Sequence, residues 1–248
     1  MRRIFSLMLL SAICLLASGS RLQAAFEDIG AGARAIGMGS AFTAISDDAH
    51  AIYYNPAGLA QVRRGELTAG YGKLYAGLKD NSNLGSGYVG IVQPLKSGKL
   101  GSLGLGWVSL SLEGAYREDM ISFSYGKEVL ADGLFLGGTG KVLKRTFGSD
   151  IYTQNDPLFT KNGYDSTNIS ADIGLMYRPQ ASYSFALLLK DFNQPNVGLA
   201  AVDRVPWKSE AVSRITRKTS SLTATFPRRT PTLTFRWDWK NGSSKTSV

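Results

Sequence analysis

The chain has 248 residues, with 28 lysines and arginines against 19 aspartates and glutamates, and a formal net charge of +9. The basic side chains are scattered over turns and strand ends and form no helical stripe, so we expect no nucleic-acid partner. Cys14 is the only cysteine, which excludes an intrachain disulfide and a multi-thiolate metal site.

Residues 1–25 have the layout of a cleavable secretory signal peptide. Two arginines precede an uncharged apolar run over residues 4–16, and a small-residue region ends at Ala24-Ala25. The apolar run is too short for a stable transmembrane helix. We expect cleavage after Ala24 or Ala25, which removes Cys14 and three arginines, so the formal charge falls from +9 to +6. The alternative is an uncleaved N-terminal anchor.

The next segment, residues 30–60, is rich in small residues and ends in the turn Asn55-Pro56-Ala57-Gly58. Pro56 fixes its own φ and biases Asn55 toward an extended conformation, and Gly58 allows a tight return. The Asn55 side chain can satisfy backbone groups inside a buried turn. We therefore predict a rigid turn that joins a small N-terminal segment, residues 26–65, to the first strand.

This segment resembles the N-terminal region of the FadL-like outer-membrane barrels, including the PorV/PorQ-type branch, whose signature reads roughly GMGxAFxAxxDDxxAxxxNPAGLA. The matching residues are Gly37, Met38, Gly39, Ala41, Phe42, Asp47, Asp48, Ala51 and residues 55–60. The resemblance implies that residues 26–65 form a plug, or hatch, inside a fourteen-strand barrel. It also implies that Asn55, Pro56, Ala57 and Gly58 anchor this hatch and act in ligand access or gating.

The same resemblance implies a location in the bacterial outer membrane, in contact with its lipid. The function that it implies is uptake or binding of a hydrophobic small molecule, such as a long-chain fatty acid. The alternative is a non-transporting scaffold whose partners are proteins of an outer-membrane secretion system, as in the PorV-like branch.

After residue 65, apolar residues alternate with small or polar ones, which is the period of a β-strand. The clearest stretch is 167–178, where Ile169, Ala171, Ile173, Leu175 and Tyr177 alternate with Ser170, Asp172 and Gly174. Other alternating stretches are 66–75, 85–93, 100–112, 120–127, 183–189 and 233–239. We count nine or ten strands between residues 66 and 240, and the pattern weakens after about residue 206, where charges crowd in.

The apolar rows face either lipid or a second sheet. Tyrosines and tryptophans near strand ends, a Gly-, Ser- and Asp-rich opposite face and the leader favour lipid, and the alternative is a secreted soluble β-sandwich. We predict an all-β fold: an antiparallel transmembrane β-barrel over residues 66–248, short of the family's strand number, with a plug that contains a little helix. A short turn is expected at residues 178–180 and a long extracellular loop at 148–166.

We predict that the protein is not an enzyme and has no catalytic, metal or cofactor site. Asp47-Asp48 and His50 could ligate a cation, but we favour the two aspartates as caps of a short helix beginning near Ala49. Gly30 and Gly32 imitate a dinucleotide-binding fingerprint without the preceding strand that it requires. A lipid-modifying enzyme is disfavoured, because His50 is the only histidine and no serine lies in a nucleophile elbow.

Overall fold

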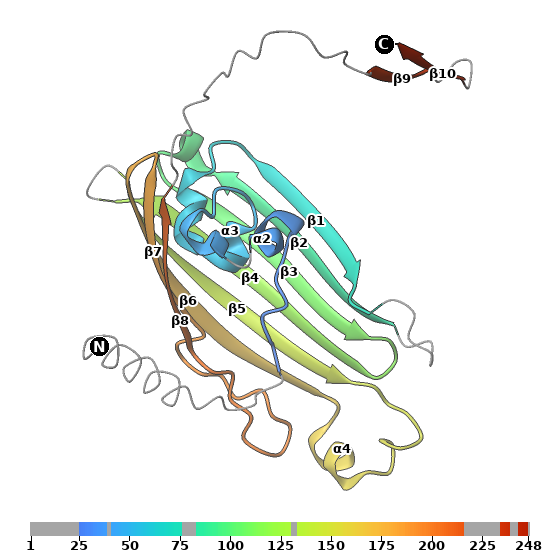
Figure 1. Cartoon of the computed structure of the whole chain (residues 1–248). Coiled ribbons are helices and arrows are strands. Elements are labelled where there is room, and N and C mark those ends of the chain that lie inside the picture. Colours follow the sequence, from blue (N-terminus) through green and yellow to red (C-terminus); the bar gives the residue numbers. More distant parts are fainter. Residues whose placement is uncertain are drawn as a thin grey trace, which may run out of the picture. The chain divides into compact units, whose positions relative to one another are not determined.

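The structure is a computed structural model that describes residues 25–38, 41–75, 83–129, 133–215, 234–238 and 243–247. The chain forms two compact units, Met1–Thr216 and Arg217–Val248. In the first unit, eight strands form one sheet in which neighbours in the chain are neighbours in space (Figure 1). In the second unit, β9 (Thr234–Asp238) and β10 (Ser243–Ser247) form an antiparallel pair.

The eight-stranded sheet is antiparallel throughout. Its strands are β1 (Glu66–Lys73), β2 (Leu84–Pro94), β3 (Ser102–Leu112), β4 (Tyr116–Glu128), β5 (Leu134–Phe147), β6 (Asp165–Gln180), β7 (Tyr183–Lys190) and β8 (Lys208–Ile215). The helical turns are short: α2 (Ala33–Gly37), η1 (Ala41–Ala44), α3 (Ala51–Tyr54), η2 (Pro56–Gln61), η3 (Leu95–Gly98) and α4 (Pro157–Asn162).

No helix within the described residues is long and apolar enough to cross a lipid bilayer. The antiparallel, mostly β character predicted from the alternation is confirmed for the part of the chain that the structure describes. Closure of the sheet into a barrel stays a prediction.

Two strands are found where the sequence pattern was weak or unrecognised. On β5 the inward positions hold residues as different as Phe135 and Lys141, and the outward ones include Gly138 and Gly140, so neither face is uniformly apolar. On β8 the charged side chains of Lys208, Glu210 and Arg214 take alternate positions and are half-buried, and the strand pairs with β7 along its length. The strand pattern therefore continues beyond residue 206.

The turn predicted at residues 178–180 is wrong by two or three residues. β6 extends to Gln180, and residues 181–182 make the turn into β7. The pairing of β6 with β7 shifts register between Tyr177 and Gln180. This irregularity accommodates Pro179, which has no N–H to give to a regular ladder. The long loop expected at 148–166 is found at 148–164 and contains α4.

One face of the sheet is apolar and exposed. Side chains alternate between the two faces of a strand, and large apolar residues of β1 to β7 point away from the rest of the unit. They are Leu67, Tyr71, Val89, Ile91, Leu105, Trp107, Ile121, Phe123, Tyr125, Leu136, Val142, Ile169, Ile173, Tyr177, Tyr183, Phe185, Leu187 and Leu189. We call these eighteen residues the outer apolar face.

The opposite, inner face carries mostly small and polar side chains, and the N-terminal segment covers it (Figure 1). Buried inner residues include Ser102, Ser122, Ser124, Thr139, Ser170 and Ser184. The apolar core lies between the N-terminal segment and this face, where Phe42 and Tyr54 pack with Tyr88, and Ile52 and Leu59 with Val92. The described residues of the segment 26–65 are therefore packed onto the inner face of the sheet, and none of them belongs to a strand.

Candidate functional site

The turn at residues 55–58 is completely buried and hydrogen-bonded to its surroundings. Asn55 has φ −160°, an extended conformation, and η2 begins at Pro56, where a missing N–H costs nothing. The Asn55 Oδ1 accepts from the Ala57 amide at 3.1 Å, and its Nδ2 donates to the Thr43 carbonyl at 3.0 Å. The predicted hydrogen bonding of Asn55 is confirmed, and it ties the turn to η1.

Three glycines make the seat of this turn on the sheet. Gly126 of β4, Gly137 of β5 and Gly174 of β6 lie directly opposite one another in register. A Cβ atom at these positions would lie 2.3 Å from the Pro56 carbonyl oxygen, 2.3 Å from the Ala57 nitrogen and 2.1 Å from the Asn55 Oδ1, respectively. The turn therefore contacts the sheet backbone directly, through its own backbone at Gly126 and Gly137 and through the Asn55 side chain at Gly174. We call Gly126, Gly137 and Gly174 the glycine row.

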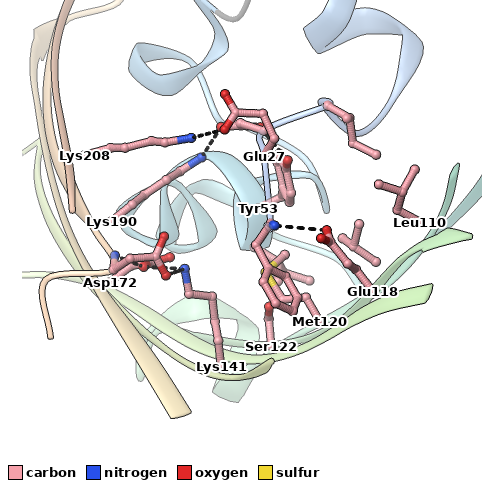
Figure 2. Close-up of a pocket in the computed structure, with 16 residues that line it drawn as sticks. Glu27, Tyr53, Leu110, Glu118, Met120, Ser122, Lys141, Asp172, Lys190 and Lys208 are labelled. Carbon is pink, nitrogen blue, oxygen red and sulfur yellow. Dashed lines mark hydrogen bonds and ion pairs between the residues drawn. The ribbon is translucent and has the colours of Figure 1, made fainter. Parts of the chain in front are cut away.

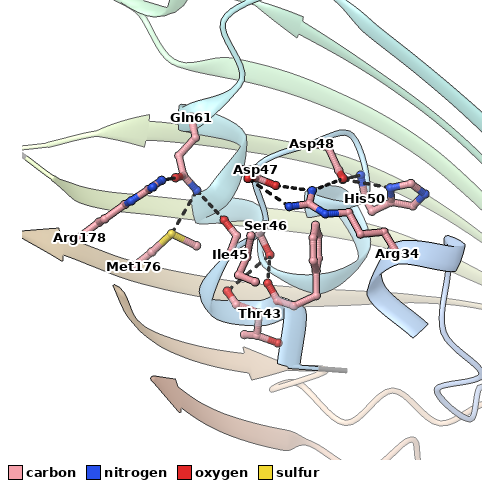
Figure 3. Close-up of polar contacts among 11 residues, drawn as sticks. Arg34, Thr43, Ile45, Ser46, Asp47, Asp48, His50, Gln61, Met176 and Arg178 are labelled. Atoms are coloured by element: carbon pink, nitrogen blue, oxygen red, sulfur yellow. Dashed lines mark hydrogen bonds and ion pairs between the residues drawn. The ribbon is translucent and has the colours of Figure 1, made fainter. Parts of the chain in front are cut away.

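The opposite side of the turn is equally tight. A Cβ atom on Gly58 would lie 2.1 Å from the Ser46 carbonyl oxygen. The Gln61 side chain, at the end of η2, donates to the Ile45 carbonyl at 2.8 Å and accepts from the Arg178 guanidinium at 2.6 Å (Figure 3). The turn is thus fixed between residues 43–46 on one side and the glycine row on the other.

The other signature residues are placed differently from one another. Phe42 is fully buried and makes an edge contact with Tyr54, at 5.4 Å between ring centroids. Gly37 ends α2 and Met38 follows it as the C-cap, and both are exposed. Gly39 lies outside the described residues. Only Phe42 among these four contributes to the core beside the turn.

The prediction that Asp47 and Asp48 cap a short helix beginning near Ala49 is confirmed for Asp48, whose Oδ1 accepts a hydrogen bond from the His50 backbone amide at 2.9 Å just before the helix. Helix α3 begins at Ala51, and its N-cap, His50, makes no side-chain capping bond. Both carboxylates also bind the Arg34 guanidinium, at 2.6 Å from Asp47 and 2.9 Å from Asp48 (Figure 3). Asp48 therefore uses one oxygen for the cap and the other for the ion pair.

Electrostatics within this group favour the charged forms. Hydrogen bonds from Arg34 to Asp47, and the charges of both aspartates, raise the pKa of the guanidinium. Burial works against ionisation of Asp48, but hydrogen bonds from His50 and Arg34 outweigh it and lower the pKa of this carboxyl. The cluster is consequently a surface ion pair network that links α2 to the start of α3.

His50 has a packing role in the structure. Its ring stacks on Tyr88 with centroids 5.2 Å apart, and its Nδ1 lies 3.0 Å from the Asp48 Oδ1. A Cβ atom on Gly32, whose φ is +79°, would lie 2.2 Å from the His50 Nε2. Within the described residues, no group of three His, Cys, Asp or Glu side chains could hold a metal ion. Gly32 therefore makes room for the His50 ring.

Beside the turn lies a cleft with two chemically different sides (Figure 2). It is bounded by residues 26–29, by α3 and by the inner face of β3 to β8. The apolar side is made by Ile29, Ile52, Val108, Leu110 and Met120, and the charged side by Lys141, Asp172, Lys190, Asp191 and Lys208. The free space inside is about 60 Å³, which is room for a few water molecules.

Ion pairs fill the charged side. The Lys141 Nζ lies 2.7 Å from the Asp172 Oδ1 and 2.6 Å from the Asp191 Oδ1, and all three groups are almost inaccessible to solvent. The Ser170 hydroxyl donates to Asp191 at 2.6 Å. Buried charges persist in proteins when they are paired in this way, so the inner wall here is polar and its buried charges are paired.

Residues 26–28 close the cleft by three contacts with the wall. The Asp28 carboxylate lies 2.9 Å from the Lys190 Nζ and accepts a hydrogen bond from Tyr53. Glu27 lies 3.6 Å from the Lys208 Nζ. The Phe26 amide donates to the Glu118 Oε2 at 3.0 Å. These residues connect the very start of the described chain to β4, β7 and β8.

The protonation state of Asp28 follows from this environment. Burial disfavours its charge, but the charge of Lys190 and hydrogen bonds from Tyr53 and Lys190 outweigh burial and lower the pKa of the carboxyl. Burial and the neighbouring Asp28 charge raise the pKa of the Tyr53 phenol. Asp28 is therefore ionised at neutral pH and Tyr53 is a hydrogen-bond donor to it.

Sequence reasoning missed the cleft and the glycine row. The signal that could have revealed the cleft is a charged residue at an inward position of an alternating stretch, as at Asp172. A charged residue directly after such a stretch, as at Lys190, is a second signal of this kind. The glycine row had no local signal, because it exists only once β4, β5 and β6 are paired in register.

The chain matches no family model and no curated protein sequence. Among solved structures it is similar to a CymD monoaromatic hydrocarbon channel, with a TM-score of 0.47 and 17% sequence identity. The similarity covers 76% of this chain and 62% of that channel, so the chain spans less than two thirds of the channel's length. A similarity this distant assigns no family, and the FadL-like resemblance of residues 30–60 stays a resemblance.

Proposed function

We propose that this protein is an outer-membrane barrel protein that binds or passes a hydrophobic small molecule at the cleft beside its plug. The observation that carries the proposal is the outer apolar face, which lies opposite a small and polar inner face. A soluble monomer rarely exposes a contiguous apolar patch larger than a few hundred Å², whereas a membrane barrel presents such a face to lipid and its polar face to the interior.

The dimensions of the outer apolar face support a membrane-spanning role. On β6 it extends from Ile169 to Tyr177, about 26 Å along the strand at roughly 3.3 Å per residue. At a tilt of about 40° this covers roughly 20 Å of a band that is about 25 Å tall in such barrels. Tyr125, Tyr177 and Tyr183 lie near the same end of β4, β6 and β7, as in an interfacial aromatic girdle.

The membrane placement is tested by comparing an isoleucine-to-arginine substitution on the outer apolar face with the same substitution in a loop. Ile173, in the middle of β6, and Ile151, in the loop before it, are 52% and 76% exposed. If the outer apolar face meets lipid, Ile173→Arg lowers the free energy of unfolding in vesicles by about 2–4 kcal/mol, and Ile151→Arg changes it little. Equal, small effects of the two substitutions would contradict the proposal, because a water-exposed isoleucine tolerates arginine.

The cleft supports binding of a molecule with a long apolar part. Its apolar side accommodates hydrocarbon, and its charged side can orient a polar end. The present free space is too small for such a ligand, so binding requires displacement of residues 26–29, which now occupy the entrance. A long-chain fatty acid is the ligand class that we propose, and residues 55–58 remain the fixed anchor of the plug during this movement.

Ligand binding is tested with radiolabelled oleate by equilibrium dialysis of the purified protein in detergent. Val108→Trp fills the apolar side of the cleft from β3, and we expect it to weaken binding at least about tenfold, a loss of about 1.4 kcal/mol. Val142→Trp places the same side chain on the outer apolar face of β5 and should leave binding unchanged. No saturable binding to the wild type would refute the transport function.

A scaffold function remains the second candidate, and exposed apolar side chains on two loops favour it. Ile151 and Tyr152 are 76% and 81% exposed in the loop before β6, and Val202 is 73% exposed in the loop before β8. These two loops leave the same end of the sheet, because β5 and β7 run in the same direction. If the protein is a scaffold, secretion-system proteins co-purify with it, and a Tyr152→Ser variant loses them while it still folds.

A further inference from the structure

The backbone nitrogen of Phe26 lies against a buried carboxylate. Glu118, on the inner face of β4, is only 5% exposed and accepts hydrogen bonds from the Phe26 nitrogen at 3.0 Å and from the Tyr116 hydroxyl at 2.5 Å. Both donors are neutral in an intact chain. A buried carboxylate is stable when a positive charge compensates it, so the charge of its neighbours decides whether Glu118 is balanced.

Arg145, the cation across the strand pair from Glu118, is already engaged by another acid. Arg145 of β5 is the register partner of Glu118, and its guanidinium lies 2.7 Å from the Asp203 carboxylate. These three residues together carry two carboxylates and one guanidinium, and the guanidinium is bound to Asp203. One further positive charge at the Phe26 nitrogen would balance the group.

The backbone at Phe26 carries a second indication. Phe26 has φ +55°, a conformation that non-glycine residues rarely adopt and that is strained for a bulky side chain. The part of this strain that depends on φ arises from the clash of the residue with the carbonyl oxygen of the preceding residue. If no residue precedes Phe26, the φ angle ceases to exist and the strain is released, while the nitrogen stays beside Glu118.

We infer that the leader is removed at the bond between Ala25 and Phe26, and that the Phe26 ammonium so formed pairs with Glu118 and fixes the entrance segment over the cleft. In this hydrolysis, catalysed by a leader-removing endopeptidase of the exporting cell, water supplies the hydroxyl that makes the Ala25 carboxylate. The Phe26 nitrogen gains the protons that make it an ammonium. The inference rests on the export that the proposed function requires.

The alternative bond, between residues 24 and 25, would place the new charge less favourably. Ala25 is buried and packs in an apolar cluster with Leu143, Val197 and Val205. An ammonium at this residue would be generated beside apolar side chains, where an unpaired charge is costly. The sequence leaves both bonds open, and the surroundings of residues 25 and 26 select the second.

The first test is N-terminal sequencing and intact mass of the protein isolated from membranes of the exporting cell. We expect a mature chain that begins at Phe26. A chain that begins at Ala25, or at any other residue, would overturn the inference. Neither result bears on oleate binding, so failure of this inference and failure of the proposed function are distinguishable.

The second test is labelling of the N-terminal amine near pH 7, where an unpaired α-amine reacts ahead of lysine. In the folded protein we expect labelling at least about tenfold slower than after unfolding, because the amine reacts only when its pair opens. Glu118→Gln should abolish most of this protection, and the exposed Glu113→Gln should leave it intact. Equal labelling of the wild type and Glu118→Gln would overturn the ion pair.

A third measurement covers the case in which Glu118→Gln is not exported. Two chains are refolded from denaturant, one beginning at Phe26 and one with Met and Ala25 before it, each with and without the Glu118→Gln substitution. Glu118→Gln should raise the unfolding equilibrium constant of both chains. We expect the factor to be at least about ten times larger in the chain that begins at Phe26 than in the extended chain. Equal effects in the two chains would overturn the inference.

Discussion

Replacing Gly137 by alanine should separate the plug turn from the sheet. The new Cβ would lie 2.3 Å from the Ala57 nitrogen and 2.3 Å from the Pro56 carbonyl carbon, about 1.1 Å short of an ordinary contact. Both atoms belong to the backbone, so no side-chain rotation relieves the collision. The turn must retreat by about 1 Å from β5, which also strains the bond from the Ala57 amide to Asn55.

The expected cost combines two effects. Overpacking of a close-packed site destabilises by roughly 1–3 kcal/mol, and weakening one buried hydrogen bond adds about 1 kcal/mol. We expect Gly137→Ala to lower the free energy of unfolding by about 2–4 kcal/mol. The matched control is Gly140→Ala on the same strand, where a Cβ meets nothing within 4 Å on the exposed face. This change should be neutral or stabilising by up to about 1 kcal/mol.

The assay is urea unfolding of the two variants and the wild type in lipid vesicles, followed by tryptophan fluorescence and by heat-modifiable migration on gels. Trp107, on the outer apolar face, reports on transfer between lipid and water. Stabilities of Gly137→Ala and Gly140→Ala that agree within about 0.5 kcal/mol would refute the close approach of the turn and β5.

Three further outcomes follow from the same contacts. Asn55→Ala leaves the buried Ala57 amide without its acceptor and the Thr43 carbonyl with only the longer bond from Ser46, and should cost about 2–4 kcal/mol in the same urea titration, with Asn55→Asp intermediate. The lowered pKa of Asp28 means that its pair with Lys190 stabilises the fold above the ordinary value of 3.8 and is lost as pH falls through the lowered pKa. Asp28→Asn should accordingly flatten the acid dependence of the unfolding free energy below about pH 4. Arg34→Gln should cost less than about 1 kcal/mol, because the guanidinium is half exposed; a larger loss would show that α2 depends on this ion pair.

The strands could be predicted from sequence wherever one face is uniformly apolar. β6 and β7 have an unbroken outer row, Ile169 to Tyr177 and Tyr183 to Leu189, because every second residue of these strands belongs to the same exposed apolar face. β5 has no such row, since Gly138 and Gly140 lie on its outer side. Its inner side must fit the plug residue by residue, and that fit leaves no periodic signal.

The turn could be predicted and its surroundings could not. Pro56, Gly58 and the Asn55 amide act within a few residues of one another, so their conformational preferences are readable locally. The hydrogen bond from the His50 amide to Asp48 was readable in the same way, but the pairing of Asp47 and Asp48 with Arg34 was not, because Arg34 comes from a separate helix. Long-range partners of this kind are visible only when the fold has brought the segments together.

The glycine row also bears on how the strands find their correct partners. Gly126, Gly137 and Gly174 align only when β4, β5 and β6 pair in one register. The smallest slip that keeps the same faces inward is two residues, and on β5 it would put Phe135 or Thr139 beneath the turn. Either side chain would collide with the turn's backbone. The turn at residues 55–58, which precedes these strands in the chain, therefore packs well only on strands paired in the correct register.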